Sequence, residues 1–328
     1  MRILEVSRYK TNFSDHTLPF VKEQGESISA LGHEVDYFLV KGSYITAVKA
    51  LKAKIRGFKP DIVHAHYGLS AITAELQSEI PVVTTFHNGE TLNPLVNFAS
   101  SLMSLKAKHV IYVAQHIRDL SYFKAKRYSI IPCGVPMEEM VIIPKGEARK
   151  QLGWDPDKKY ILFGGAFDNR RKNYKLLAEA VGILNHTLYT VHPTPDIICI
   201  EMKGLSRAEC VLRMNACDVF ALPSHSEGSP QALKEAMAVN CPCIATDIAD
   251  VRELFGNEPG HWILRNPRKT HERWDGDEKS LQEMVELLQD ALVFDGRTNG
   301  RKRIEELQLT NEAVAKRILK IYEDIIGK

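Results

Sequence analysis

The sequence has 328 residues, of which 44% are hydrophobic and 26% charged, with 43 Lys and Arg against 41 Asp and Glu. This composition is typical of a globular protein long enough for two domains, and it argues against a disordered chain. No run approaches the roughly 20 apolar residues of a membrane-spanning helix. The net charge is +2, and we expect no nucleic acid among the partners.

The amino terminus, Met1 to Val6, has the pattern of a strand rather than that of a signal peptide, so we expect a cytoplasmic protein. The six cysteines lie in or beside apolar runs without paired Cys-x-x-Cys spacing. They therefore predict buried reduced thiols in place of disulfides or a zinc site.

The first half of the chain predicts a parallel sheet covered by helices. Short runs rich in Val and Ile alternate with helical patterns, which is typical of an α/β fold. The expected strands are 2–6, 34–40, 61–65, 81–86, 109–113 and 128–131. The prolines and glycine of 131–136, followed by a charged stretch to Lys150, indicate a connection between two domains.

A second series of strands follows that connection. We expect strands at 159–163, 197–200, 219–222, 243–246 and 262–264, again joined by helices. The last helix is predicted over 311–326 from the spacing of Val314, Ile318, Ile321 and Ile325, with Thr310 as its cap. We place the domain boundaries at 1–141 and 142–310.

The loop after the strand 159–163 has the composition of an anion site. It contains Gly164 and Gly165, which allow close backbone approach, followed by the cations Arg170, Arg171 and Lys172. Ligands of open parallel sheets bind beyond the carboxyl ends of the strands. The loop is therefore either a phosphate-binding loop or a basic surface turn.

The segment 221–247 carries the strongest signal. A buried strand leads into Glu227-Gly228-Ser229, and Pro230 is placed to occupy the first position of a helix. Backbone N–H groups near Ser229 can bind an anion, while the carboxylates of Glu227 and Glu235 can accept hydrogen bonds from sugar or ribose hydroxyls. The alternative is that both glutamates are ordinary solvated residues.

Continued to Leu254, this segment closely resembles the donor-nucleotide segment of retaining glycosyltransferases with two Rossmann-like domains, the GT-B, family 4-like enzymes of bacterial polysaccharide assembly. The resemblance covers nearly the whole chain. It implies two Rossmann-like α/β domains with parallel sheets facing across a cleft, and a C-terminal helix, 311–328, that crosses back to the first domain.

The resemblance also implies roles for individual residues. Glu235 would bind the ribose and Glu227 a hydroxyl of the transferred sugar, with Gly228, Ser229 and Pro230 beside the donor. Gly165, Lys172 and Arg171 or Arg170 would hold the diphosphate, and Lys172 and Arg171 would stabilise its developing charge. The sequence departs from the family at Ala166, where an arginine is usual, and at Asn173, where a glycine is usual.

In the first domain, His87 follows a buried strand, and the resemblance makes it the residue that orients the sugar and the incoming hydroxyl. A lone histidine in this place is otherwise a structural residue. We expect His64 and His66 to face opposite sides of their strand, so that they cannot share one ion. We therefore expect no metal site and no cofactor.

The sequence thus predicts a glycosyltransferase that moves a sugar from a UDP- or GDP-sugar to the hydroxyl of a glycan or lipid-linked acceptor, in the synthesis of a cell-surface polysaccharide or glycolipid. Rival interpretations are a sugar-nucleotide epimerase or hydrolase, or a catalytically silent sugar-nucleotide-binding protein. A nicotinamide dehydrogenase is excluded, since neither domain has Gly-x-Gly-x-x-Gly after its first strand.

The basic charge of the chain is concentrated in its first half. Residues 1–150 carry 19 Lys and Arg against 14 Asp and Glu, or +5, and the remainder carries 24 against 27, or −3. Lys49, Lys52, Arg56 and Lys59 fall on one helix face. The face is either merely solvated or docks, with Lys124, Lys126 and Arg127, on an anionic membrane surface.

Overall fold

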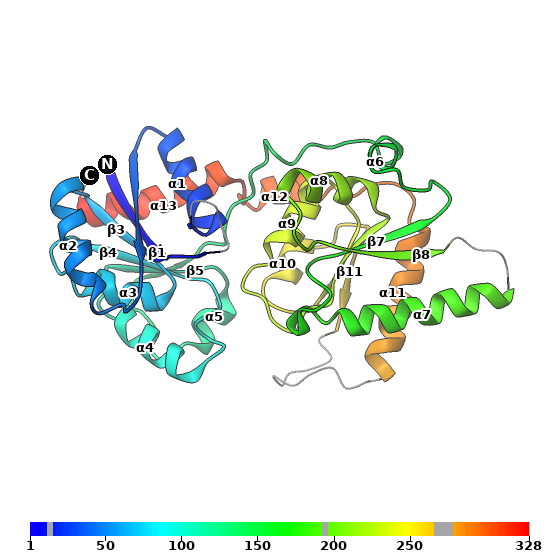
Figure 1. Ribbon diagram of the computed structural model, residues 1–328, viewed down its shortest axis with the longest axis horizontal. Coiled ribbons are helices and arrows are strands. Elements are labelled where there is room, and N and C mark those ends of the chain that lie inside the picture. The colour runs from blue at the N-terminus through cyan, green and yellow to red at the C-terminus, as the bar shows by residue number, and fades with distance from the viewer. Residues whose placement is uncertain (12–15, 192–195, 266–277, 328) are drawn as a thin grey trace. The chain divides into compact units, whose positions relative to one another are not determined.

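The computed structural model describes residues 1–11, 16–191, 196–265 and 278–327. The chain folds as two compact units (Figure 1), of which unit 1 is Met1–Gly134 with Gln308–Lys328 and unit 2 is Val135–Leu307. The first unit ends before the expected residue 141. Its last residue before the connection packs closely on α13 (Asn311–Ile326), since a Cβ atom on Gly134 would lie 2.5 Å from Asn311 Oδ1.

Unit 1 contains a six-stranded parallel sheet in the order β2-β1-β3-β4-β5-β6. Its strands are β1 (Arg2–Arg8), β2 (Glu34–Val40), β3 (Ile62–His66), β4 (Val82–Phe86), β5 (His109–Tyr112) and β6 (Tyr128–Ile130). Its helices are α1 (Pro19–Ala30), α2 (Ala47–Phe58), α3 (Gly68–Glu75), α4 (Pro94–Ser104), α5 (Gln115–Leu120) and α13 (Asn311–Ile326).

Side chains from alternate positions of β1 and β3 enter two different cores. Ile3 and Ile62 pack with Ile28 of α1 and with the apolar stripe of α13. Leu4 and Val63 point the other way and pack against α2 and α3. As predicted, α13 begins after a Thr310 cap, whose hydroxyl accepts a hydrogen bond from the N–H of Ala313.

Unit 2 contains a five-stranded parallel sheet in the order β11-β10-β9-β7-β8. Its strands are β7 (Lys159–Phe163), β8 (Ile197–Glu201), β9 (Val219–Leu222), β10 (Cys243–Thr246) and β11 (His261–Leu264). Its helices are α6 (Lys145–Leu152), the 3-10 turn η1 (Arg170–Lys172), α7 (Tyr174–Val191), α8 (Arg207–Ala216), α9 (Gln231–Ala238), α10 (Val251–Phe255), α11 (Glu278–Val293) and α12 (Gly300–Glu306).

The eleven predicted strands are all present in two parallel sheets, so the expected α/β class with two Rossmann-like units is confirmed. All six cysteines are free thiols. No helix among the described residues is long and apolar enough to cross a membrane.

Candidate functional site

Two loops at one edge of the unit 2 sheet contact each other. The loop after β7 contains η1, and the loop after β9 leads into α9. Because β7 and β9 are neighbours in the sheet, their carboxyl ends place these loops side by side. The N–H of His225 donates to the carbonyl oxygen of Arg171 over 2.9 Å, which fixes one loop against the other.

Lys172 and Glu227, predicted separately from two motifs, form an ion pair. Lys172 Nζ lies 2.8 Å from Glu227 Oε1, and only 15% and 10% of the two side chains are exposed. Gly165 makes room for this lysine, since a Cβ atom on Gly165 would lie 3.0 Å from Lys172 Cγ. The structure therefore brings together a phosphate-type cation and a sugar-type carboxylate.

Glu235 lies in the second turn of α9 and pairs with Arg207 at the start of α8. Arg207 Nη1 is 3.2 Å from Glu235 Oε1. Burial raises the pKa of Glu235, and the charge of Arg207 opposes this rise. The sequence analysis missed Arg207, because the contact joins residues far apart in the chain and no local pattern announces it.

The loop after β10 contributes Asp250, which accepts a hydrogen bond from the Ser229 hydroxyl over 2.6 Å. Burial raises the pKa of Asp250, while the positive charge of Lys234 lowers it. Lys234 is fully buried in α9. Both residues escaped the sequence analysis, although a lysine beside Leu233 in a helix next to a ligand loop was an available signal.

Helix α9 begins one residue later than predicted. Pro230 is its N-cap, with φ −69° and ψ 105°, and Gln231 is its first helical residue. Pro230 has no side-chain oxygen with which to cap the helix, and the structure shows no side-chain cap there. The backbone around Gly228 and Ser229 and the first turn of α9 thus form the kind of helix start that binds anions.

The arginines of η1 differ from Lys172 in their surroundings. Arg170 and Arg171 are exposed, and within the part of the chain that the structure describes no ion pair joins either side chain to an acid. Asn173 has a left-handed backbone with φ 58°, a conformation that asparagine tolerates, so the usual glycine is not required there.

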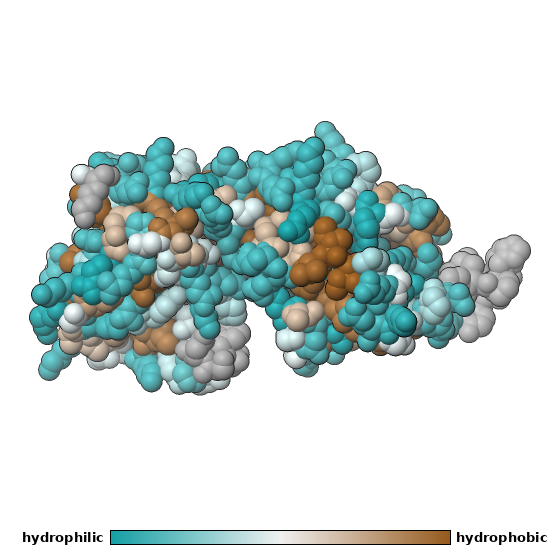
Figure 2. All heavy atoms as spheres, turned by 90° about the horizontal axis from the view of Figure 1, so that it is seen from above, coloured by the Kyte–Doolittle hydropathy of each residue, from teal (hydrophilic) through white to brown (hydrophobic). Residues whose placement is uncertain are grey.

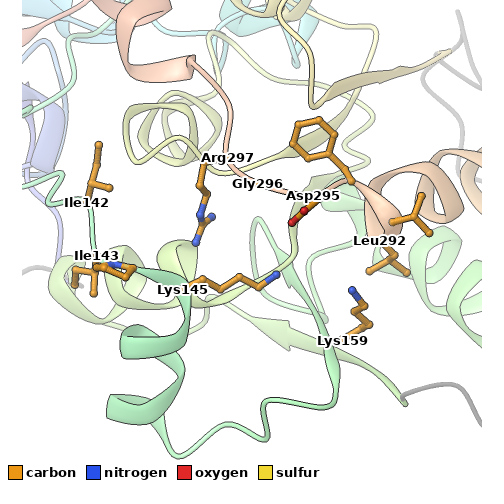
Figure 3. Close-up of a pocket in the computed structure, with 11 residues that line it drawn as sticks. Ile142, Ile143, Lys145, Lys159, Leu292, Asp295, Gly296 and Arg297 are labelled. Carbon is orange, nitrogen blue, oxygen red and sulfur yellow. The ribbon is translucent and has the colours of Figure 1, made fainter.

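A pocket of about 780 Å³ lies elsewhere in unit 2, at the amino end of β7 (Figure 3). Its cations are held by the chain itself. Lys145 and Lys159 contact Asp218, and Arg297 donates to the carbonyl oxygen of Met214. This pocket is on the opposite edge of the sheet from the candidate loops, and we assign it no ligand.

In unit 1, His87 follows β4 directly and is partly buried. Its Nε2 lies 3.1 Å from His66 Nδ1, and its ring packs 4.5 Å from that of Phe20 between centroids. The N–H groups of His87 and Gly68 donate to the carboxyl group of Glu90, over 3.2 and 3.0 Å. Complete burial raises the pKa of Glu90 to about 7.

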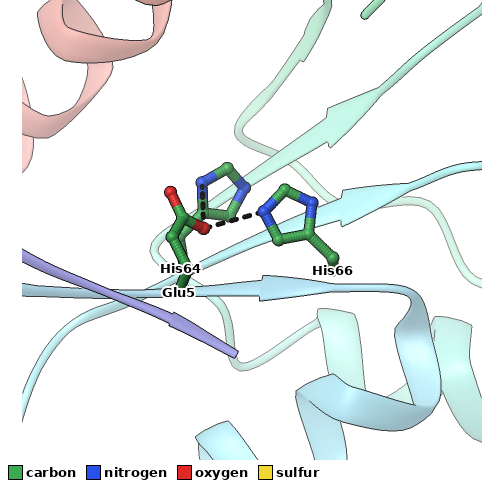
Figure 4. A group of neighbouring side chains, drawn as sticks. All are labelled: Glu5, His64 and His66. Carbon is green, nitrogen blue, oxygen red and sulfur yellow. Dashed lines mark hydrogen bonds and ion pairs between the residues drawn. The ribbon is translucent and has the colours of Figure 1, made fainter. Parts of the chain in front are cut away.

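The expectation that His64 and His66 face opposite sides of β3 was wrong. Residues two apart on a strand point to the same face, and both rings stack at 4.5 Å between centroids. Figure 4 shows them converging on Glu5 of β1. His66 Nε2 lies 2.7 Å and His64 Nδ1 3.7 Å from Glu5 Oε2, and all three side chains are fully buried.

Glu5, His64 and His66 are the one group of potential metal ligands found among the described residues, with their ligand atoms within 4.8 Å of one another. Two ligands of one tetrahedral zinc ion, each at about 2.0 Å, lie roughly 3.3 Å apart. The 2.7 Å contact between Glu5 and His66 is shorter and has the length of a charge-assisted hydrogen bond. Glu5 and His66 are therefore joined directly by a hydrogen bond.

These contacts define a buried network with assignable donors. The Tyr322 hydroxyl of α13 lies 2.5 Å from His64 Nδ1, and Thr85 Oγ1 lies 2.7 Å from His64 Nε2. Burial lowers the pKa of His64 well below its usual value and raises that of Tyr322, so the tyrosine donates. The carboxyl group of Glu5 lies 2.7 Å from His66 Nε2, and His66 Nδ1 lies 3.1 Å from His87 Nε2, so the contacts run in a chain from Glu5 to His87. Glu5 was missed by the sequence analysis, although an acid inside the apolar strand 2–6 was a signal.

One residue of the predicted basic face of α2 has a counter-charge, since Lys52 lies 3.6 Å from Glu79. Lys54, which is not part of that face, contacts Asp36. Lys49, Arg56 and Lys59 are exposed on the polar side of a helix whose other side buries Leu51 and Ile55. This is the pattern of an ordinary surface helix.

Comparisons with known proteins relate both units to glycosyltransferases. Residues 23–139 match the Glycosyltransferase Family 4 model, and residues 199–290 match the Glycosyl transferases group 1 model. A putative teichuronic acid biosynthesis glycosyltransferase, TuaC, from Bacillus subtilis is 28% identical over 65% of this chain and 59% of its own. An N,N'-diacetylbacillosaminyl-diphospho-undecaprenol alpha-1,3-N-acetylgalactosaminyltransferase from Campylobacter jejuni is 26% identical over 65% of this chain and 58% of its own. The alignments thus span less than two thirds of these relatives.

Solved structures agree in fold over nearly the whole chain. Sucrose-phosphate synthase from Thermosynechococcus elongatus has a TM-score of 0.77 at 17% identity, over 99% of both chains. HepE from Anabaena, in complex with UDP and glucose, has a TM-score of 0.73 at 12% identity, over 99% of this chain and 100% of its own.

Proposed function

The chain belongs to the GT-B glycosyltransferases, and we propose that it transfers a sugar from a nucleoside diphosphate donor to an acceptor hydroxyl, with retention of anomeric configuration. The reaction serves the synthesis of a cell-surface polysaccharide or glycolipid. Retention is part of the proposal because the donor segment 221–254 resembles that of retaining enzymes.

The observation that carries the proposal is the Lys172–Glu227 ion pair at the start of α9. A cation, a carboxylate and an uncapped helix start lie within two adjacent loops. A diphosphate can displace the carboxylate from the lysine, and the released Glu227 is then available to accept a hydrogen bond from a sugar hydroxyl.

Within this site we assign each residue one role. Glu235, held by Arg207, accepts the ribose hydroxyls. Lys172 and Arg171 stabilise the charge that develops on the leaving diphosphate, a task for fixed cations. These cations replace a divalent ion, so we propose that the enzyme requires no metal.

On the basis of the family resemblance, we assign His87 the role of orienting the acceptor hydroxyl and the sugar. The network of unit 1 supports this role, since Glu5 and His66 hold the ring through a chain of hydrogen bonds of 2.7 and 3.1 Å. The two ring nitrogens of His87 have neighbours in this scheme, since Nε2 lies 3.1 Å from His66 Nδ1 and Nδ1 lies 3.8 Å from Cys133 Sγ. Glu5 and His66 are positioning residues in this scheme.

For the donor we propose a UDP-sugar first and a GDP-sugar second, because HepE was solved with UDP-glucose. For the acceptor we propose a lipid-linked glycan, because the relative from Campylobacter jejuni is named for an undecaprenol-linked one. A lipid-linked acceptor would require the protein to reach a membrane surface.

The test is turnover of UDP- and GDP-sugars by the purified protein, with and without lipid-linked and soluble acceptors. We expect release of nucleoside diphosphate together with a glycosylated product, whose anomeric configuration NMR compares with that of the donor. Altered sugar nucleotide without acceptor would instead indicate an epimerase or hydrolase. Binding without turnover of any donor would indicate a silent binding protein.

A further inference from the structure

Helix α4 of unit 1 has its polarity reversed. The side chains that it buries are small and polar: Asn97, Ser100, Ser101 and Ser104. Those that it exposes are large and apolar, at spacings of three, four and three: Leu95, Phe98, Leu102 and Leu105. Leu95 is 81% exposed and Phe98 49%. A surface helix ordinarily shows the opposite arrangement.

The buried polar side of α4 holds the helix against unit 1 through hydrogen bonds and close contacts, although Asn97 Oδ1 and Ser100 Oγ have no hydrogen-bond partner among the described residues. The Ser101 hydroxyl donates to the carbonyl oxygen of Asn97 over 2.6 Å, and the Asn97 amide donates to that of Leu120 over 2.9 Å. Small side chains let α3 approach closely, since a Cβ atom on Gly68 would lie 2.2 Å from Ser100 Cβ. The apolar side is therefore not the side that packs α4 against unit 1.

The exposed apolar surface extends beyond the helix. The ring of Phe98 lies 6.3 Å from that of Tyr122 and 5.4 Å from that of Phe123, between centroids. The α4 face, as we name this surface, consists of seven exposed side chains: Leu92, Leu95, Phe98, Leu102, Leu105, Leu120 and Tyr122. By contrast, the side of the molecule in Figure 2 is mostly hydrophilic, with hydrophobic residues in separate groups.

The sequence around the α4 face is strongly basic. Residues 91–130 contain six cations and one acid, a net charge of +5 that equals the whole excess of residues 1–150. The cations are Lys106, Lys108, Arg118, Lys124, Lys126 and Arg127, and the acid is Asp119. All four of the lysines are exposed.

We propose that the α4 face docks on an anionic lipid bilayer. Leucine, phenylalanine and tyrosine side chains insert at the boundary between headgroups and acyl chains, and flanking lysines bind anionic headgroups. A second copy of the chain is disfavoured as occupant, because a symmetric contact would bring two patches of the same positive charge together. The basic face of α2, whose Lys52 is paired with Glu79 and which exposes no apolar stripe, is not the docking surface.

Docking would bring the enzyme to a lipid-linked acceptor, and this part of the argument rests on the proposed function. Binding to the bilayer itself requires neither donor nor acceptor. The experiment is co-sedimentation of the full chain with vesicles of phosphatidylcholine alone or with phosphatidylglycerol. The test variant is Leu95→Ser with Phe98→Ser, and the matched control is Lys49→Glu with Lys59→Glu on α2. Circular dichroism and thermal unfolding check that each variant folds.

We expect the wild type to sediment with the anionic vesicles only, and less so as NaCl rises. The α4 variant should bind at least ten-fold more weakly, and the α2 variant should bind within two-fold of the wild type. Equal binding by the α4 variant and the wild type would overturn the proposal, as would no binding by the wild type, or a wild-type dimer in ultracentrifugation that the α4 variant abolishes. Turnover of a soluble acceptor in any of these cases leaves the proposed function standing.

Discussion

The charged side chains of the candidate site differ in burial between the two units. In unit 2, Lys172, Glu227, Glu235 and Arg207 form ion pairs between loops and helix ends, and each keeps part of its side chain exposed. In unit 1, Glu5, His64 and His66 are fully buried and bonded to one another. An ion pair that keeps some contact with solvent can exchange one partner for a ligand, whereas separating a fully buried network leaves unpaired charge. We therefore expect ligand-driven rearrangement in unit 2 and fixed geometry in unit 1.

The sharpest test of this difference is Lys172→Ala. We expect kcat to fall by about 100-fold or more, because a fixed cation that stabilises the leaving diphosphate is lost. The matched control is Lys203→Ala, which removes an exposed lysine paired with Asp168 on the neighbouring strand-to-helix loops. Steady-state kinetics should find its kcat within two-fold of the wild type. An unchanged kcat in Lys172→Ala would refute the assigned role.

The variant Glu90→Gln tests whether the buried carboxyl group of Glu90 in unit 1 has a raised pKa. The pKa of Glu90 is raised from 4.5 to about 7 in the folded protein, so its stabilising contribution is present below pH 4.5 and is lost as pH rises through 7. A shift of this size corresponds to about 3 kcal/mol. We expect the free energy of unfolding of the wild type, relative to that of the variant, to fall by about this amount between pH 4 and 8.

Urea unfolding at several pH values measures that difference, and Glu26→Gln at an exposed position serves as the control. If the wild type and Glu90→Gln have parallel pH profiles, Glu90 titrates normally and is not sealed in the unit 1 interior.

Glu235→Ala should act on binding more than on chemistry. Ribose contacts are the same in the ground state and the transition state, so the donor KM should rise about 30-fold while kcat changes little. Kinetics with varied donor, together with calorimetric titration of the nucleoside diphosphate, separates the two effects. A fall in kcat at an unchanged KM would move Glu235 from the ribose to the reacting group.

The smallest expected effect concerns the missing arginine at position 166. The carbonyl of Arg171 is bonded to His225, which keeps this arginine beside the Glu227 loop. Arg171→Ala should therefore weaken nucleoside diphosphate binding about ten-fold, while Arg170→Ala should not, and Ala166→Arg should be tolerated or should tighten binding. Equal calorimetric affinities of Arg171→Ala and the wild type would show that the cation comes from another residue.

Strand positions were predictable from sequence because each strand is a short Val- and Ile-rich run between polar segments. The end of α13 and its Thr310 cap were predictable for a similar local reason. The two motifs that contain Lys172 and Glu227 were recognisable in the sequence. Their pairing depends on β7 and β9 being neighbours in the sheet, and the order of strands in a sheet cannot be read from a single sequence.

The features that the sequence analysis missed or placed wrongly depend on tertiary contacts or on the period of a strand. Arg207 meets Glu235 only through the packing of α8 and α9. His64 and His66 were placed on opposite faces, although the two-residue period of a strand puts them on one face. The reversed polarity of α4 was hidden for a physical reason, since apolar residues at helical spacing predict a buried face and sequence does not reveal which side of a helix is covered.

The position of helix α13 at the end of the sequence determines which of the two units can fold first during synthesis. It supplies Val314, Ile318 and Tyr322 to a core shared with Ile3 and Ile62, although the ribosome makes these residues more than 300 positions after the first strand. Unit 2 is continuous in sequence and can close as soon as it emerges. The amino-terminal part of unit 1 must wait until α13 leaves the exit tunnel, because until then only α1 covers that side of its sheet and His64 lacks its contact with Tyr322.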